Sequence, residues 1–240
     1  MSLLNSIYDV LLRSFGSQGW WPILSRAGQR GFDSKGYHKG AYDCLDEDDL
    51  FEVCIGAILT QNTSWKNVER ALAVLRDEGL LSIERIASAS ESDIGRAIRS
   101  AGYYNQKAKK LKAFARSVLD EYGSLSSLFS SKNAREFLLS IWGIGPETAD
   151  SMLLYAGGWP VFVVDAYTKR ICSRLGICSS KASYDELQSM FHSAIERRPS
   201  IYNEYHALLV RLAKSYCVKG VPDCKSCPLS DVCSFNRSKH

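Results

Sequence analysis

The sequence predicts an all-α protein, and three observations support this prediction. Four segments repeat apolar residues at the i, i+3, i+4, i+7 spacing of a helix with one buried face: residues 66–77, 107–121, 184–196 and 202–216. A fifth segment, residues 50–59, is apolar on nearly every side apart from Glu52, as expected for a helix in the middle of a bundle. The strand-like run 161–164 is too short to found a sheet.

Each amphipathic segment has a defined apolar stripe. In chain order, the stripes are Val68, Ala71, Leu72 and Leu75; then Ala108, Leu111, Ala115 and Val118; then Leu187, Met190, Phe191 and Ala194; and finally Tyr205, Leu208, Leu209, Leu212 and Tyr216. The stripe of 107–121 leaves its lysines on the other faces of the helix.

One segment near the start of the chain has the composition of a loop. Six of the 17 glycines fall between Gly16 and Gly40, together with several arginines and lysines. We interpret residues 23–43 as a flexible, slightly basic loop, either a ligand contact or an insertion without consequence for function.

The overall composition is that of a globular protein. Hydrophobic residues make up 45% of the 240 residues and charged residues 23%, which excludes a disordered or fibrous protein. No apolar run reaches the roughly 18–20 residues of a membrane-spanning helix, and the first residues lack the basic region of a secretory signal. We therefore expect a cytoplasmic or nucleoid-associated protein in a reducing compartment, without membrane contact.

The net charge of +4 conceals strong patterning. Residues 43–52 carry six acidic residues and no basic one, whereas residues 94–119 carry seven basic residues and no acidic one. A basic patch of this kind is typical of a surface that binds nucleic acid, although a solvated helix face balanced by acids elsewhere has the same appearance.

The eight cysteines form two groups. Cys44, Cys54, Cys172 and Cys178 are scattered, mostly among apolar neighbours, and we interpret them as small core residues. Cys217, Cys224, Cys227 and Cys233 are crowded into the tail with the spacing C-x6-C-x2-C-x5-C. In a reducing compartment such crowding indicates a metal site more often than disulfides.

The stretch 137–177 contains a glycine-rich turn between two predicted helices. The turn is Gly143-Ile144-Gly145, and Pro146 suits the first position of the following helix. Two glycines permit positive φ and the close approach of a phosphate, which the amides at the helix start would bind. Such a hairpin binds a DNA phosphate without recognising the base sequence.

The pattern I-W-G-I-G-P-E-T-A-D, followed by V-V-D-A-Y-T-K-R and by the four-cysteine tail, resembles the endonuclease III superfamily of helix-hairpin-helix DNA glycosylases over about residues 50–235. The resemblance implies a two-lobed fold with a lobe of residues 46–156, which contains the hairpin at about 134–156, and a second lobe of residues 1–45 plus 157–240. It also implies that Asp165 is the catalytic carboxylate, although Asp165 is also a suitable cap for a helix starting at Ala166.

Glu147 stands where bifunctional members of the family carry a lysine that attacks the sugar. The resemblance therefore implies a monofunctional glycosylase that leaves the abasic site intact, because a carboxylate cannot form an imine. Lys169 and Lys214 are the other lysines that we consider for such a role.

Aromatic residues indicate the branch of the family. Gly19-Trp20-Trp21-Pro22 and Trp65 look like the 3-methyladenine DNA glycosylase III type, in which such aromatic residues sandwich the extruded base. Stacked indoles would favour a cationic alkylated purine. For Trp142 and Trp159 we expect core packing instead.

The resemblance assigns further residues to DNA and to a cofactor. Gln61 and Tyr103 match the positions that enter the duplex gap left by base flipping. The DNA phosphate contacts are Gly143, Gly145, Glu147, Thr148, Lys219 and Lys225, and the ligands of a [4Fe–4S] cluster are Cys217, Cys224, Cys227 and Cys233. A structural zinc site is the alternative for the cysteines.

The sequence thus predicts a monomeric base excision repair glycosylase that acts on double-stranded DNA containing a damaged base, with alkylated, 3-methyladenine-like purines as the preferred substrates. One alternative keeps the fold but changes the lesion to oxidised pyrimidines or mismatched thymine or uracil. Another is a lesion-binding protein without catalytic activity.

Overall fold

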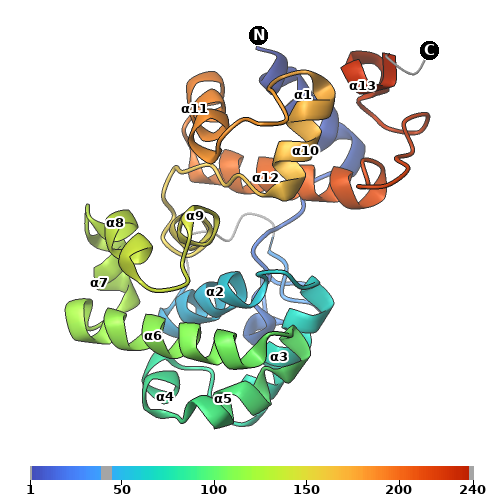
Figure 1. Ribbon diagram of the computed structural model, residues 1–240. Helices are drawn as coiled ribbons and strands as arrows, with labels where there is room; N and C mark the ends of the chain where they lie inside the picture. Colours follow the sequence, from blue (N-terminus) through green and yellow to red (C-terminus); the bar gives the residue numbers. More distant parts are fainter. Residues whose placement is uncertain (1, 39–44, 238–240) are drawn as a thin grey trace. The chain divides into compact units, whose positions relative to one another are not determined.

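The structure, a computed structural model, describes residues 2–38 and 45–237 (Figure 1). Within these residues the chain forms thirteen α-helices and three short 3-10 turns and has no strand, which confirms the predicted all-α class. No helix in the described part is long and apolar enough to cross a membrane.

The chain divides into two compact units. Unit 1 comprises Met1–Trp20 and Pro160–His240, and unit 2 comprises Trp21–Trp159. The helices of unit 1 are α1 (Leu3–Phe15), α10 (Ala166–Leu175), α11 (Tyr184–Ala194), α12 (Pro199–Ser215), η3 (Ser230–Val232) and α13 (Ser234–Arg237). Those of unit 2 are η1 (Leu24–Arg26), α2 (Glu47–Leu59), α3 (Trp65–Asp77), α4 (Ile83–Ser88), α5 (Glu91–Ala97), η2 (Arg99–Ala101), α6 (Tyr104–Tyr122), α7 (Leu125–Ser130), α8 (Ala134–Ser140) and α9 (Pro146–Tyr155).

Unit 1 is built around α12, which packs against α1 and α10. Four residues of its predicted apolar stripe are buried, Tyr205, Leu208, Leu209 and Leu212, whereas Tyr216 lies just beyond the helix and is half-buried. The rings of Tyr202 and Tyr205 contact Phe162 edge-on. The strand-like run 161–164 is buried but forms no strand: Phe162 stacks on Phe191 at 3.8 Å between ring centroids and donates its N–H to Nε2 of His192.

Unit 2 is built around α2 and α6. Every residue of α2 from Asp49 to Leu59 is buried, as expected for a helix in the middle of a bundle. Helix α6 packs against α2, α4, α5 and α7, and α9 packs against α2 and α8. The buried stripe of α3 is the predicted one. That of α6 contains the predicted residues together with Phe114 and Lys107, so the expectation that all lysines of α6 lie on its other faces was wrong for Lys107.

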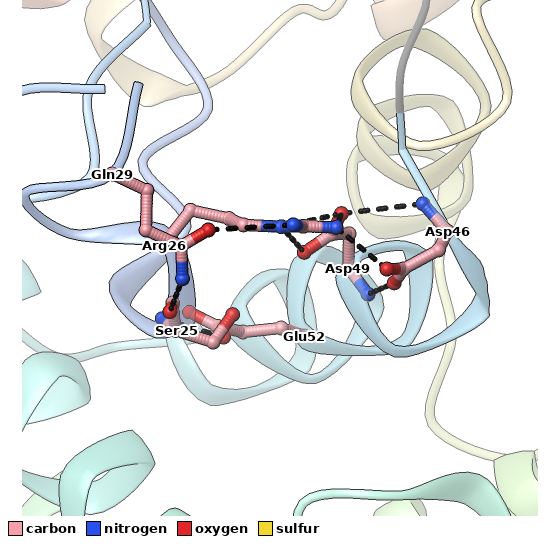
Figure 2. A network of polar contacts seen from close by, with 6 residues as sticks. All are labelled: Ser25, Arg26, Gln29, Asp46, Asp49 and Glu52. Carbon is pink, nitrogen blue, oxygen red and sulfur yellow. Dashed lines mark hydrogen bonds and ion pairs between the residues drawn. The ribbon is translucent and has the colours of Figure 1, made fainter. Parts of the chain in front are cut away.

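The segment that precedes α2 is held to that helix by buried carboxylates (Figure 2). The guanidinium of Arg26 binds both oxygens of Asp49 and also pairs with Asp46, and Glu52 accepts the backbone N–H groups of Leu24 and Ser25. Asp49 and Glu52 are 2% and 1% exposed. The described part of the expected flexible loop is therefore anchored to α2. This anchoring explains why residues 21–38 belong to unit 2, although we expected the boundary between the units at residue 45. Residues 39–43 of that loop lie outside the described residues.

Several smaller expectations are decided by burial. Cys54 and Cys172 are buried core residues as predicted, Cys178 is only half-buried, and Cys44 lies outside the described residues. Trp159 donates its indole N–H to the carbonyl of Phe129. Trp142 was expected in the core but is 57% exposed, because α8 ends at Ser140 and Trp142 stands in the turn beyond it.

Candidate active site

The hairpin between α8 and α9 has the expected form at one of its two glycines. Gly143 has a φ of +85°, and the aliphatic part of the Lys110 side chain lies against the place where a Cβ would project. Gly145 instead has an extended backbone, caps α9 and faces open space. Pro146 is the first residue of α9, as predicted. The first turn of α9 therefore presents N–H groups that its own carbonyls do not satisfy, which suits a phosphate.

Gln61, one of the two expected wedge residues, is hydrogen-bonded to this hairpin. Its side-chain amide donates to the carbonyl of Gly143 at 3.2 Å and to the hydroxyl of Thr148 at 3.0 Å. Its carbonyl oxygen accepts from Nζ of Lys110 at 2.6 Å. Thr148 is 7% exposed, so its hydroxyl faces Gln61 and the protein interior.

Tyr103, the other expected wedge residue, is 74% exposed and has a φ of +46°. Asn62, the neighbour of Gln61, has a φ of +54°, and no other described residue apart from glycines has a positive φ. Both loops thus have a backbone conformation that is rarely populated and is common at functional sites.

A buried lysine joins the two loops. Lys107 is 2% exposed, and its Nζ donates to the carbonyl of Leu59 at 2.8 Å and to that of Ala101 at 2.9 Å. These carbonyls belong to the last residues of α2 and η2, two positions before Gln61 and Tyr103. Burial, with a smaller contribution from the charge of Lys110, lowers the pKa of Lys107 to about 8.

More basic residues of the run 94–119 than expected therefore have a structural role. Besides Lys107, Lys112 donates to the carbonyl of Ala89 and Arg116 to that of Ala87, at the C-terminal end of α4. These cations satisfy helix carbonyls, which reduces the part of the run available for DNA.

The predicted base-pocket residues of unit 2 contact one another. The rings of Trp21 and Trp65 are 5.3 Å apart and nearly perpendicular, at 87°. A base can be sandwiched only between rings that face each other, so this arrangement of Trp21 and Trp65 leaves no sandwich between them. Tyr155 adds a third ring at 5.0 Å from Trp21, and the indole of Trp21 lies on Gly56 of α2. The N–H of Trp65 is buried and has no hydrogen-bond partner.

The predicted residues of unit 1 are connected through a residue that the sequence did not single out. Nε2 of His206 lies 3.6 Å from Oδ2 of Asp165, and the ring of Trp20 meets the His206 ring edge-on at 5.8 Å. His206 is 4% exposed and Asp165 is 9% exposed. A polar residue within the buried face of α12 was the available sequence signal for His206.

Asp165 also caps α10, as the alternative interpretation held. Its Oδ1 accepts the N–H of Thr168 at 2.7 Å, so only part of the carboxylate is used by the helix. Burial would raise the pKa of Asp165, but His206 and Thr168 outweigh burial and hold the pKa below its usual value. Asp165 is therefore a buried anion at neutral pH.

The four cysteines of the tail line one small cavity of about 30 Å³. Burial raises the pKa of the Cys227 thiol to about 11, and the nearby thiols of Cys217, Cys233 and Cys224 add to this effect. No group of three or more His, Cys, Asp or Glu side chains in residues 2–38 and 45–237 is arranged so that it could hold a metal ion. The four thiols thus share a cavity but are not arranged as a ligand set, although four thiolates are the kind of donors that an iron–sulfur cluster takes.

The remaining predicted residues lie at the surface. Lys219 and Lys225 are exposed in the tail of unit 1, and Lys169 and Lys214 are exposed on α10 and α12. Glu147 is exposed in the first turn of α9.

Comparisons with known proteins identify the family of the chain. Residues 55–197 match the family model described as HhH-GPD superfamily base excision DNA repair protein. A protein of Methanocaldococcus jannaschii, provisionally named a DNA repair glycosylase, is 41% identical over 235 residues, which are 96% of both chains. The crystal structure of H. pylori 3-methyladenine DNA glycosylase bound to 1,N6-ethenoadenine is 27% identical, with a TM-score of 0.68 over 88% of this chain and 95% of that one.

The fold is also that of endonuclease III. The structure of a non-covalent endonuclease III–DNA complex has a TM-score of 0.77 at 19% identity, over 100% of this chain and 99% of that one. Since the family model matches more than half of the chain and the M. jannaschii relative nearly all of it, the chain is a DNA glycosylase of base excision repair and belongs to the HhH-GPD superfamily.

Proposed function

We propose that the chain is a monofunctional DNA glycosylase that releases alkylated, 3-methyladenine-like purines from double-stranded DNA. The observation that carries this proposal is Asp165, a buried carboxylate at the start of α10 whose pKa is held below its usual value. Cleavage of the N-glycosidic bond builds positive charge on the sugar, which a fixed anion stabilises. The partner in the first turn, Thr168, fixes one oxygen and leaves the other to face His206.

The aromatic residues support the choice of lesion. An N3- or N7-alkylated purine is cationic and its glycosidic bond is already weakened, so the reaction needs little acid catalysis. Indole faces favour a cation by about 0.5–2 kcal/mol each. We assign Trp20, Trp21 and Trp65 to base binding, and the perpendicular contact of Trp21 with Trp65 means that either the base uses one face of each ring or a ring turns on binding.

The DNA contacts of the proposal come from separate elements. We assign phosphate binding to Gly143, Gly145 and the first turn of α9 with Glu147 and Thr148, and further backbone contacts to the exposed Lys219 and Lys225. We assign Gln61 and Tyr103 to the gap left by the flipped base, which requires Gln61 to leave its hydrogen bonds with Gly143 and Thr148.

The four tail cysteines fit a [4Fe–4S] cluster by their chemistry. Cys217, Cys224, Cys227 and Cys233 line the same cavity, and Arg174 donates to the Sγ of Cys217 and to the carbonyl of Val218. A bound cluster would order the tail and would not take part in the glycosyl chemistry. Anaerobic purification followed by iron, sulfide and zinc analysis tests the assignment, and a colourless protein with stoichiometric zinc would contradict it.

Defined duplexes test the function. The panel contains 3-methyladenine, 7-methylguanine, thymine glycol, uracil opposite guanine and G·T, and the readouts are released base and alkali-labile sites. We expect release of the methylated purines by the wild type and none by Asp165→Asn, which should still bind the duplex. Release of thymine glycol, uracil or thymine instead would contradict the proposed substrate and favour the alternative, a glycosylase for oxidised pyrimidines or mismatched thymine or uracil.

A further inference from the structure

Helix α12 carries buried polar side chains within an otherwise apolar face. Asn203, Glu204 and His206 are 2%, 6% and 4% exposed, in the middle of the core of unit 1. A polar side chain in such a place weakens the fold unless it makes defined contacts. Glu204 contacts the segment that leads to Trp20, and His206 contacts both Trp20 and Asp165.

Glu204 forms hydrogen bonds with the backbone segment that precedes Trp20. Its two carboxylate oxygens accept the hydroxyl of Ser17 at 2.8 Å and the backbone N–H of Gln18 at 2.6 Å. Trp20 follows two residues later, so its backbone is anchored to α12 one turn or less from His206.

His206 determines the surroundings of both side chains. The Trp20 ring meets the imidazole edge-on at 82°, so the rotation of the indole is limited by His206. Oδ1 of Asp165 is bound to the N–H of Thr168, and Oδ2 faces Nε2 of His206 at 3.6 Å. Each carboxylate oxygen therefore has a different neighbour, and the orientation of the carboxylate about Cβ–Cγ depends on both.

We propose that His206 is a positioning residue that sets the orientation of the Asp165 carboxylate and of the Trp20 indole together. The inference rests on the proposed function, in which Asp165 stabilises the charged sugar and Trp20 binds the base. His206 touches neither substrate nor reacting atoms in this role. It couples base binding to the carboxylate through one side chain of α12.

Single-turnover cleavage of a 7-methylguanine duplex tests this coupling. His206→Leu keeps the volume but has no polar atom, and we expect a decrease of about tenfold or more in the cleavage rate with less than about threefold change in duplex affinity. His206→Gln, whose side-chain amide nitrogen corresponds in position to the imidazole Nε2 that faces Asp165, should recover part of the rate. Tyr205→Phe is the matched control, since it removes a buried hydrogen bond of α12, the one to the carbonyl of Leu4, and the Tyr205 ring packs against Tyr8, Phe162 and Phe191.

A double-mutant cycle separates coupling from general destabilisation. In the double variant His206→Leu/Trp20→Phe, the fold-loss in cleavage rate should be smaller than the product of the losses in the two single variants. In Tyr205→Phe/Trp20→Phe, the loss should equal that product. An unchanged rate in His206→Leu, while Asp165→Asn is inactive, overturns the inference and leaves the proposed function standing. Full activity of Asp165→Asn contradicts the proposed function itself.

A measurement on Asp165→Asn keeps the inference testable should the His206 variants fail to fold. The chain has four histidines, so their imidazole NMR signals can be assigned individually. We expect the signal of His206 to move when Asp165 becomes Asn, while that of His192, which accepts from Phe162, stays in place. An unmoved His206 signal overturns the proposed contact.

Discussion

The side-chain amide of Gln61 donates to the carbonyl of Gly143 and so connects the turn after α2 with the hairpin between α8 and α9. Lys110 takes part in the same connection, because its Nζ binds Gln61 while its methylene groups lie on Gly143. The residue assigned to the duplex gap and the glycine assigned to the DNA backbone are therefore held by one lysine of α6.

Gln61→Ala should weaken both the fold and lesion binding. Loss of the hydrogen bonds to Gly143 and Thr148 should lower the free energy of unfolding by about 1–2 kcal/mol. Affinity for a lesion duplex should fall by about tenfold, measured by fluorescence anisotropy, because no side chain then fills the gap. Lys110→Met should lower stability as well, compared with the exposed Lys109→Met, which removes the same charge from α6. Unchanged duplex affinity in Gln61→Ala would count against its assignment.

Gly56→Ala should disturb the pocket without weakening the helix. A Cβ at Gly56 would lie 3.0 Å from Nε1 of Trp21 and 3.3 Å from Cζ2, so the indole must shift by a few tenths of an ångström. Alanine favours the helix over glycine by about 1 kcal/mol, and this gain offsets the cost of the close contact with Trp21, so the free energy of unfolding should change little. We expect a lower rate of 3-methyladenine release and an altered tryptophan fluorescence spectrum. Gly95→Ala in α5, whose Cβ would meet only ordinary contacts, is the control and should leave both unchanged.

The elements of the fold could be predicted because their signals are local. The apolar stripes of α3 and α6, the all-round apolar α2 and the Gly-Pro start of α9 each depend on residues a few positions apart. The cap formed by Asp165 follows from the same local chemistry. These features do not require knowledge of what lies across the core.

The arrangement of the site could not be predicted, because it depends on residues far apart in the chain. His206 is separated from Trp20 by most of the sequence, and Lys107 binds carbonyls of Leu59 and Ala101 that no spacing rule connects. Motif matching assigns Trp21 and Trp65 to one pocket but gives no angle between their rings. The acidic run 43–52 likewise contains no signal that distinguishes Asp49 and Glu52, which are buried in α2 and anchor the preceding segment.

Lys107 should make stability depend on alkaline pH. Its pKa is about 8 in the folded protein, against 10.5 without the fold, so between these values the unfolded chain binds more protons than the folded one. The free energy of unfolding contributed by this residue therefore rises as pH increases from about 8 to 10.5 and is constant below that window. Thermal unfolding of wild type and Lys107→Met across pH 7–10.5 should show a Tm difference that shifts in favour of the wild type in this window.

The control for Lys107 is Lys109→Met, in which an exposed lysine of the same helix is replaced. Its Tm difference from the wild type should stay constant over the same pH range. A parallel pH dependence in both variants would show that Lys107 is not the group responsible.

Glu147 should leave the enzyme without lyase activity. The side chain is a carboxylate in the exposed first turn of α9, and a carboxylate cannot form the imine that precedes strand cleavage. Incubation with a lesion duplex and borohydride should give no covalent adduct, and strand breaks should appear only after alkali. Glu147→Lys places an amine in the same turn and should create a trappable adduct. An adduct with the wild type would show that the monofunctional assignment is wrong. Lys169 and Lys214 are exposed in unit 1, so Lys169→Met and Lys214→Met would then test which of these amines is responsible.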